Sequence, residues 1–239
     1  MDLSKFTNFS LSDLKRLQGE SRIKATHTPQ KMSSALKSYL DGEKKEIMTL
    51  STSQIAGMFR KECENWYGEG KDFVIDEQNR DVVNEMMRYF GRSEKFGSMV
   101  KNTPSLDKGV LISGGVGLGK SDLFSILHSV GRKLSIAGSN QMYFRMKSIR
   151  DLNEDDFEQW VSGNLYIDDV GTEDKVYGRE LFSKLLQDRY IYAKRKPTKT
   201  FVTTNSRISE MAERYGIQVE DRLKEMFNII IWTGDSRRK

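Results

Sequence analysis

The stretch that decides the fold is residues 109–121, which read GVLISGGVGLGKS. The apolar run Val110–Ile112 predicts a buried strand, and the residues after Lys120 have helical periodicity. Between them lies a complete match to G-x-x-x-x-G-K-[ST]. Its eight positions are Gly114, Gly115, Val116, Gly117, Leu118, Gly119, Lys120 and Ser121. A strand, a glycine-rich loop and a helix in this order predict a phosphate-binding loop.

The residue types of this loop suit a nucleoside triphosphate. Glycines let the backbone curl so that successive N–H groups point at phosphate oxygens, and the helix N-terminus favours the same negative charge. Lys120 is predicted to reach the β- and γ-phosphates, and the Ser121 hydroxyl to hold Mg²⁺. The alternative is a glycine-rich turn without a ligand, and the full match between a strand and a helix argues against it. ATP and Mg²⁺ are the predicted cofactors.

Two later strands end in polar residues that fit the same chemistry. Leu165–Asp169 reads LYIDD, an apolar strand that ends in two carboxylates and has the Walker B pattern. Asp168 is predicted to bind Mg²⁺, and Asp169 to polarise the attacking water. Phe201–Asn205 reads FVTTN, and Asn205 is predicted to contact the attacking water or the γ-phosphate. An acidic loop and a Thr/Asn turn are the alternatives without function.

Apolar strands alternate with helical stretches from about residue 73 onward, which predicts an α/β fold with a mostly parallel sheet covered on both faces. The predicted strands are Gly109–Ser113, Met142–Phe144, Leu165–Ile167, Thr200–Thr204 and Asn228–Trp232. The predicted helices are Asn79–Gly91, Lys120–Gly131, Asp155–Trp160, Gly178–Lys194, Ile208–Tyr215 and Val219–Met226.

Residues 1–66 differ from the rest because they are polar and lack a strand pattern. We expect a small helical N-terminal region there, followed by the main domain at 67–239. The segment Gln54–Trp66 has apolar residues on one side of a helix, among them Cys63. Two interpretations stay open: an appendage that packs on the main domain, or a module that docks a partner. Cys63 is expected to be a buried apolar side chain.

Composition excludes several classes of protein. The 239 residues include one cysteine and two histidines, which argues against disulfides and against Cys- or His-rich metal centres. No apolar run is long enough to span a membrane, and the N-terminus has no secretory signal, so a cytoplasmic protein is expected. The net charge of +5 permits nucleic-acid binding without requiring it.

The motifs in chain order resemble the DnaC/IstB branch of the AAA+ ATPases. They are GGVGLGKS, LYIDDVGTE, QDRYIYAKRKPT, FVTTNSRISEM, EDRLKEM and GDSRR, and they cover roughly Phe73 to Lys239. The resemblance implies a P-loop NTPase with an AAA+ core, a five-stranded parallel sheet, and a homo-oligomeric ring or spiral, of which a hexamer is one form. It also implies that Arg222 acts as an arginine finger on ATP held by a neighbour. Arg238 resembles the second sensor, acting in cis, with Arg237 next to it, and Asn205 resembles the first sensor.

Contacts with DNA are plausible at two basic clusters that contain aromatic residues. One consists of Arg145, Lys147 and Arg150 with Tyr143 and Phe144. The other consists of Lys194, Arg195 and Lys196 with Tyr190 and Tyr192. The alternative for both is a solvated basic surface.

Three classes of function remain open. The favoured one is a Mg²⁺-dependent ATPase that loads a replicative DNA helicase onto single-stranded DNA. The second is an IstB-like transposition helper that assembles on duplex DNA. The third is a P-loop kinase or GTPase. A GTPase lacks support because no N-K-x-D motif occurs, and the TTN and terminal G-x-S-x-R motifs argue against a kinase. The N-terminal region would suit helicase docking, although it matches no helicase-binding motif.

Overall fold

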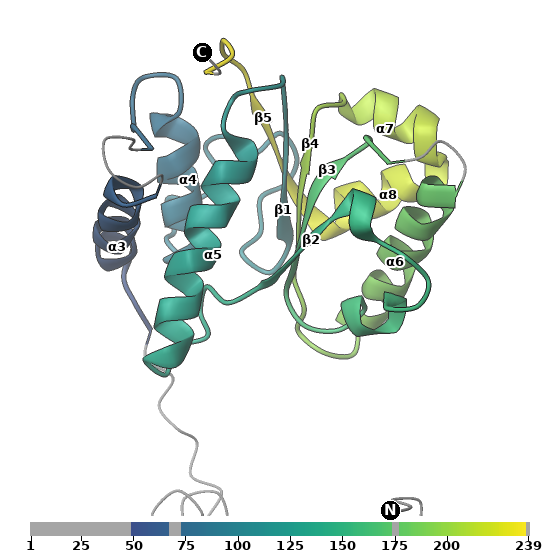
Figure 1. The fold of residues 1–239 in the computed structure, drawn as a ribbon, viewed down its shortest axis with the longest axis horizontal. Coiled ribbons are helices and arrows are strands. Elements are labelled where there is room, and N and C mark those ends of the chain that lie inside the picture. Colours follow the sequence, from purple (N-terminus) through teal and green to yellow (C-terminus); the bar gives the residue numbers. More distant parts are fainter. Residues whose placement is uncertain (1–48, 67–72, 174–176, 238–239) are drawn as a thin grey trace, which may run out of the picture. The chain divides into compact units, whose positions relative to one another are not determined.

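A parallel five-stranded sheet lies at the centre of the protein. The computed structural model describes residues 49–66, 73–173 and 177–237. The strands lie in the order β2-β3-β4-β1-β5, and every neighbouring pair is parallel (Figure 1). They are β1 (Gly109–Gly114), β2 (Arg145–Ser148), β3 (Leu165–Val170), β4 (Thr200–Thr204) and β5 (Phe227–Trp232). The predicted five-stranded parallel sheet with flanking helices is confirmed.

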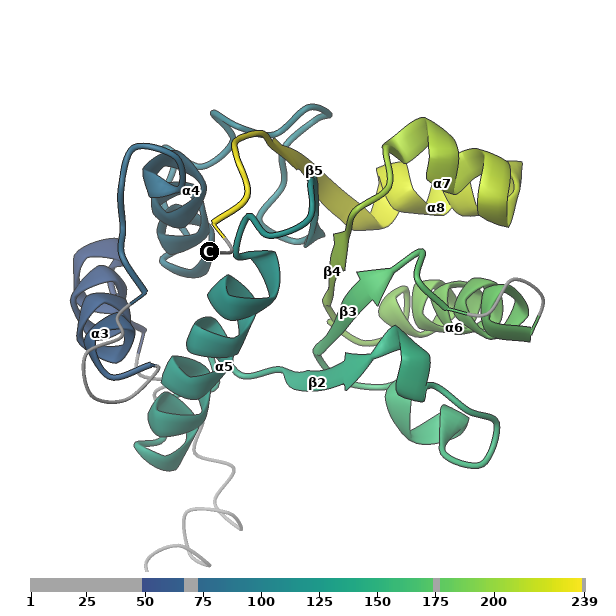
Figure 2. The same ribbon diagram turned by 45° about the horizontal axis from the view of Figure 1, so that its top comes forward.

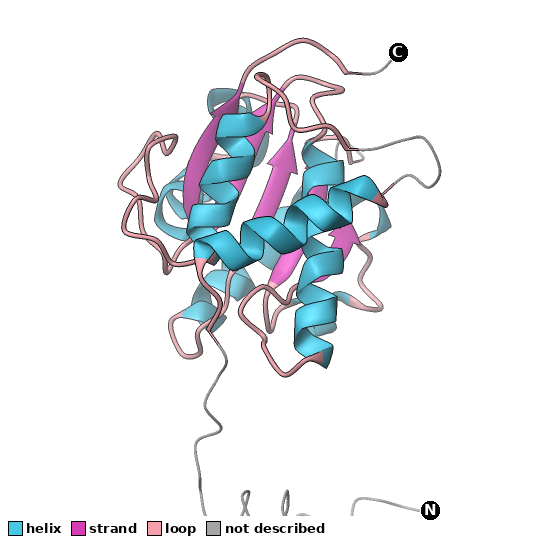
Figure 3. Ribbon diagram, turned by 90° about the vertical axis from the view of Figure 1, so that its left-hand side faces the viewer, coloured by secondary structure: helices cyan, strands magenta, loops and turns pink. Residues whose placement is uncertain are grey.

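Helices cover both faces of the sheet, as buried apolar strands require. The first layer consists of α3 (Thr52–Glu64), α4 (Arg80–Phe90) and α5 (Lys120–Ile136). The second consists of α6 (Tyr177–Ala193), α7 (Ile208–Tyr215) and α8 (Ile217–Met226). Figure 2 shows helices on either side of the strands, and Figure 3 shows the layer of α3, α4 and α5 in front of the sheet. Each layer encloses its own cluster of buried apolar side chains against the sheet.

The second predicted strand is wrong in its position. Met142 and Phe144 are buried, but the ladder begins only at Arg145, where β2 pairs with β3. β2 is an edge strand whose residues are all half-exposed, and apart from Met146 they are polar. Met142 and Phe144, just before β2, fill the core. Because they carry the apolar signal, the predicted strand lies too far toward the N-terminus. The predicted helix Asp155–Trp160 is likewise reduced to the 3-10 turn η3, Phe157–Trp160.

Helix α3 packs into the first layer although the sequence placed it in the N-terminal region. Ile55, Phe59 and Cys63 are buried, and the Phe59 and Phe73 rings meet edge to face at 6.3 Å. Burial raises the pKa of the Cys63 thiol to about 12, so Cys63 is the buried apolar side chain that was expected. Helix α3 belongs to the same compact unit as the sheet. The rest of the predicted N-terminal region, residues 1–48, lies outside the described residues.

Arg189 of α6 is a fully buried cation that donates hydrogen bonds to the loops before β3 and β4. Its guanidinium donates to the Thr200 hydroxyl at 2.9 Å and to the carbonyls of Gly163 and Lys199 at 2.8 and 2.9 Å. It also donates to the carbonyls of Trp160 and Val161. Burial lowers the pKa of Arg189 to about 9. The side chain therefore fixes the two loops that lead into β3 and β4.

Replacing Arg189 by Met is expected to lower the free energy of unfolding by about 3 kcal/mol or more, because several buried carbonyls lose their donors. Urea denaturation measures the change. The control is Arg195→Met, at an exposed arginine just beyond the same helix. Equal losses in the two variants would contradict a structural role for the buried guanidinium.

Candidate nucleotide-binding site

The predicted phosphate-binding loop lies between β1 and α5. Gly117 and Gly119 have φ values of 83° and 95°, in the left-handed region that favours glycine. Gly119 is also the N-cap of α5, so the first turn of that helix faces the loop. Backbone N–H groups at the start of α5 and the helix dipole therefore point to where an anion would bind.

Lys120 is buried, and its ammonium group joins the loop to the end of β4. The Nζ atom donates to the carbonyl oxygens of Gly114 and Gly115 at 2.8 and 2.7 Å, and to Oδ1 of Asn205 at 2.8 Å. Because β1 and β4 are parallel neighbours, their carboxyl ends lie at the same edge of the sheet. The structure thus brings together two residues that the sequence singled out 85 positions apart.

Ser121 and Asp168 form a second pair at this edge. The Ser121 hydroxyl donates to Oδ1 of Asp168 at 2.9 Å. The hydroxyls of Thr203 and Tyr166 donate to the same oxygen, at 2.6 and 2.5 Å. A carboxylate beside a serine hydroxyl is a set of hard oxygen donors, which fits Mg²⁺.

Tyr166 and Thr203 were not predicted as site residues. Tyr166 lies two positions before Asp168 on β3 and therefore on the same face of the strand. Thr203 is on the neighbouring β4. Burial, and then the charge of Asp168, raise the pKa of the Tyr166 phenol, so it remains a neutral donor. Strand alternation could have indicated Tyr166, but the contact with Thr203 depends on which strands are neighbours.

Asp169 lies at an irregularity in the sheet. The register of β3 with β4 shifts between Ile167 and Val170, and Asp169 has a φ of 55°, unusual for a residue with a side chain. Its N–H donates to Oγ1 of Thr203 at 3.2 Å. Within the described ranges, the Asp169 carboxylate has no hydrogen-bonding or ionic partner. A bulge of this kind turns a side chain out of the ladder, and here it leaves a carboxylate available to water.

The C-terminal tail returns to the phosphate-binding loop. Arg238 lies outside the described residues, but its neighbour Arg237 donates from its backbone N to the Gly117 carbonyl at 2.9 Å. The Arg237 side chain donates to Oδ1 of Asp76 at 2.8 Å and to the carbonyl of Val74 at 2.9 Å. This hydrogen bond lowers the pKa of Asp76. The segment before α4, the loop and the tail therefore meet at one place.

Arg222 lies on α8 against α6 and not at the phosphate-binding loop. Its guanidinium lies 3.9 Å from the centroid of the Tyr190 ring, and its Nε donates to Oε1 of Gln187 at 3.2 Å. A further ion pair joins it to Glu225 at 3.4 Å. These contacts hold the arginine in one orientation, apart from the other predicted site residues of its own chain.

The two basic clusters differ in their environment. Arg145 and Lys147 lie over the ring of Trp160, and Lys147 also pairs with Asp156 at 2.7 Å, so this cluster is engaged within the chain. In the second cluster, Lys194 and Lys196 are exposed and lie over Tyr190 and Tyr192, at 4.2 and 6.0 Å from the ring centroids. DNA binding at either cluster stays a prediction.

The fold and this site define the class of protein: a P-loop NTPase fold, with the strand–loop–helix unit starting from an inner strand of a parallel sheet and a carboxylate on a nearby strand. A comparison with family models and with curated proteins finds no match. Among helices of the described residues, none is long and apolar enough to cross a membrane.

Similar solved structures include the DnaC helicase loader, with 20% identity and a TM-score of 0.47 over 73% of this chain and 98% of that one. DnaI is 17% identical, with a TM-score of 0.45 over 66% of this chain and 87% of that one. AMPPCP-bound DnaA from Aquifex aeolicus is 18% identical, with a TM-score of 0.41 over 68% of this chain and 49% of that one. The similarity is one of fold at low identity, and the roles considered below rest on this chain's own residues.

Tyr166→Phe is expected to raise the Mg²⁺ concentration needed for tight ATP binding by about 10-fold, because Asp168 loses a hydrogen bond that orients it. The fold should persist, since the ring still stacks on Phe124 at 4.3 Å. Titration of Mg²⁺ with a fluorescent ATP analogue measures the shift. Tyr143→Phe, at an exposed tyrosine, is the matched control. An unchanged Mg²⁺ dependence would exclude this role for Tyr166.

Proposed function

We propose that the protein is a Mg²⁺-dependent ATPase. The observation that carries this proposal is the meeting of Lys120 with Asn205, and of Ser121 with Asp168, at one edge of the sheet. A glycine-rich turn without function would need neither a buried lysine nor a carboxylate beside the serine. The arrangement supplies a cation, N–H donors and oxygen ligands where a triphosphate and its metal need them.

Each residue has a distinct role in the proposed reaction. The N–H groups of residues 114–121 bind the phosphates, and Lys120 binds the β- and γ-phosphates. Ser121 and Asp168 would hold Mg²⁺, which would neutralise charge on the phosphates. Asp169 polarises the attacking water and takes its proton. Asn205 orients that water and, through its bond to Lys120, links the end of β4 to the bound phosphate.

The larger role is the loading of a replicative DNA helicase onto single-stranded DNA in the cytoplasm. Support comes from the order of six motifs along the chain, which resembles the DnaC/IstB branch. In this proposal the chain forms a homo-oligomeric ring or spiral, and Arg222 acts on ATP held by the neighbouring subunit. The site of Arg222, away from the loop of its own chain, fits such a role. Residues 1–66 would form the region that docks the helicase, and Arg238 or its neighbour Arg237 would contact ATP in cis.

Lys120→Ala is expected to weaken ATP binding by about 10-fold or more, because a charge-assisted hydrogen bond to phosphate is lost. Its steady-state ATP hydrolysis should fall to background. Fluorescent-analogue binding and phosphate release measure the two effects. Lys133→Ala, at an exposed lysine of the same helix, is the control. Wild-type affinity in Lys120→Ala would overturn the assignment of the phosphate-binding loop.

The same hydrolysis assay, repeated with single-stranded and with duplex DNA, distinguishes the two candidate roles. Stimulation by single strands supports the helicase loader. Stimulation by duplex DNA only would favour the transposition helper instead. A response to neither would contradict DNA as the trigger and point to a protein partner.

Arg222→Ala is expected to bind ATP normally but to hydrolyse it about 10³-fold more slowly or worse, as for other arginine fingers. Mixing it with Lys120→Ala should restore part of the activity, because one subunit then supplies the intact loop and the other the intact arginine. Lys224→Ala, an exposed neighbour on α8, is the control. If Arg222→Ala lost ATP affinity, or if mixing restored nothing, action on a neighbouring subunit would be excluded.

A further inference from the structure

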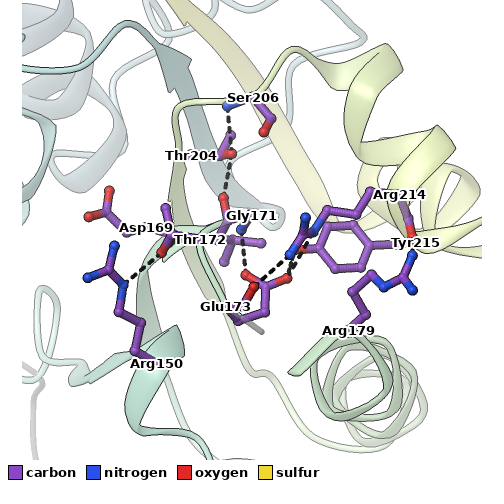
Figure 4. Close-up of polar contacts among 11 residues, drawn as sticks. Arg150, Asp169, Gly171, Thr172, Glu173, Arg179, Thr204, Ser206, Arg214 and Tyr215 are labelled. Carbon is purple, nitrogen blue, oxygen red and sulfur yellow. Dashed lines mark hydrogen bonds and ion pairs between the residues drawn. The ribbon is translucent and has the colours of Figure 1, made fainter. Parts of the chain in front are cut away.

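Glu173 is a buried carboxylate that lies four residues beyond Asp169, with its side chain 2% exposed. Its Oε2 accepts from the backbone N of Gly171 at 2.7 Å. Its Oε1 accepts from Nε of Arg214 at 3.3 Å and from the Tyr215 hydroxyl. Arg214 also donates from Nη2 to the Glu173 carbonyl at 2.8 Å (Figure 4). A carboxylate is buried in this way only when charged and hydrogen-bonding partners compensate it.

The loop that Glu173 holds begins at Asp169 and is in an uncommon conformation. Asp169 and Gly171 have φ values of 55° and 104°. The Asp169 carbonyl accepts from both the backbone N and the hydroxyl of Thr172, at 3.2 and 2.8 Å. The Val170 carbonyl accepts from the Thr204 hydroxyl at 2.6 Å. A strained backbone of this kind persists only where surrounding contacts fix it, and such contacts often serve function.

The side chain of Asp169 points away from the Glu173 cluster (Figure 4), so Glu173 does not take part in its chemistry directly. Glu173 instead bonds to the backbone N of Gly171, two residues after Asp169. Space at Gly171 is limited as well, because an added Cβ would lie 3.0 Å from Oγ of Ser206. If Glu173 moved, Gly171 would move with it. Because only two peptide units separate Gly171 from Asp169, the position of Asp169 would change as well.

The other end of the cluster belongs to α7. Arg214 and Tyr215 are its last two residues, and the helix starts at Ile208, soon after Asn205. Tyr215 also packs on Phe182 of α6, with ring centroids 4.9 Å apart. The cluster thus joins the loop after β3 to the helix that follows β4, on the side of the sheet away from α5.

We propose that Glu173, clamped by Arg214 and Tyr215, is a positioning residue that holds the Asp169 carboxylate in place for ATP hydrolysis. This inference rests on the proposed ATPase function. The hydrogen bonds of Glu173 go to Gly171, Arg214 and Tyr215, so ATP binding should not depend on it. Its effect should appear in kcat alone, and only while Asp169 has its carboxylate.

The test compares Glu173→Gln and Tyr215→Phe with the control Glu213→Gln, an exposed glutamate on the same helix. We expect kcat for ATP hydrolysis to fall by about 10-fold to 100-fold in Glu173→Gln, as for other misplaced catalytic groups, with the Kd for ATP within about twofold. Tyr215→Phe, which removes one hydroxyl and no packing volume, should reduce kcat in the same direction. Glu213→Gln should match the unmodified protein.

A second comparison separates positioning from a purely structural role. In the Asp169→Asn background, Glu173→Gln should cause no further loss of kcat, because the group it positions is already absent. A further loss of the same size there, a matching rise in Kd, or an unchanged kcat in the otherwise unmodified protein would each overturn the inference. Should Glu173→Gln fail to fold, Tyr215→Phe with and without Asp169→Asn decides by the same criteria. If the unmodified chain shows no Lys120-dependent hydrolysis, the proposed function fails, and this inference with it.

Discussion

Parallel pairing of β3, β4 and β1 is the constraint on which the rest of the site depends. Their carboxyl ends meet at one edge, so Asp168, Asn205 and the phosphate-binding loop become neighbours although they are far apart in the sequence. Hydrogen bonds then connect them in pairs, Lys120 with Asn205 and Ser121 with Asp168. Burial of the two apolar layers stabilises the sheet. The polar side chains at its edge therefore do not have to stabilise the fold.

Each polar group at this edge also has a supporting contact behind it. Asp168 is held by the hydroxyls of Tyr166 and Thr203, and the Asp169 loop is held by Glu173. Arg237 in the C-terminal tail contacts both the loop, at Gly117, and the segment before α4, at Asp76. Arg222 lies away from this edge, with its contacts on α6 and α8. Most of the predicted site residues therefore lie together in one chain, whereas Arg222 lies apart from them.

The sequence predicted much of this fold because its signals are local. The helix over Ile208–Tyr215 matches its predicted bounds, and the buried strands were found to within a few residues. The error at β2 arose because Met142 and Phe144 carry the apolar signal while Arg145–Ser148 make the ladder. A four-residue edge strand of half-exposed, mostly polar residues has no periodic pattern of its own to detect.

The sequence by itself determined the glycine-rich loop at residues 114–121, since glycines, lysine and serine at fixed spacing specify a backbone conformation and a charge without help from elsewhere. It also determined which strands end in carboxylates and amides. Only the tertiary structure decided which of these side chains touch, because strand order is set by packing and not by chain order. The hydroxyls on Asp168, the clamp of Glu173 by Arg214 and Tyr215, and the packing of α3 into the core all depend on residues brought together by that order.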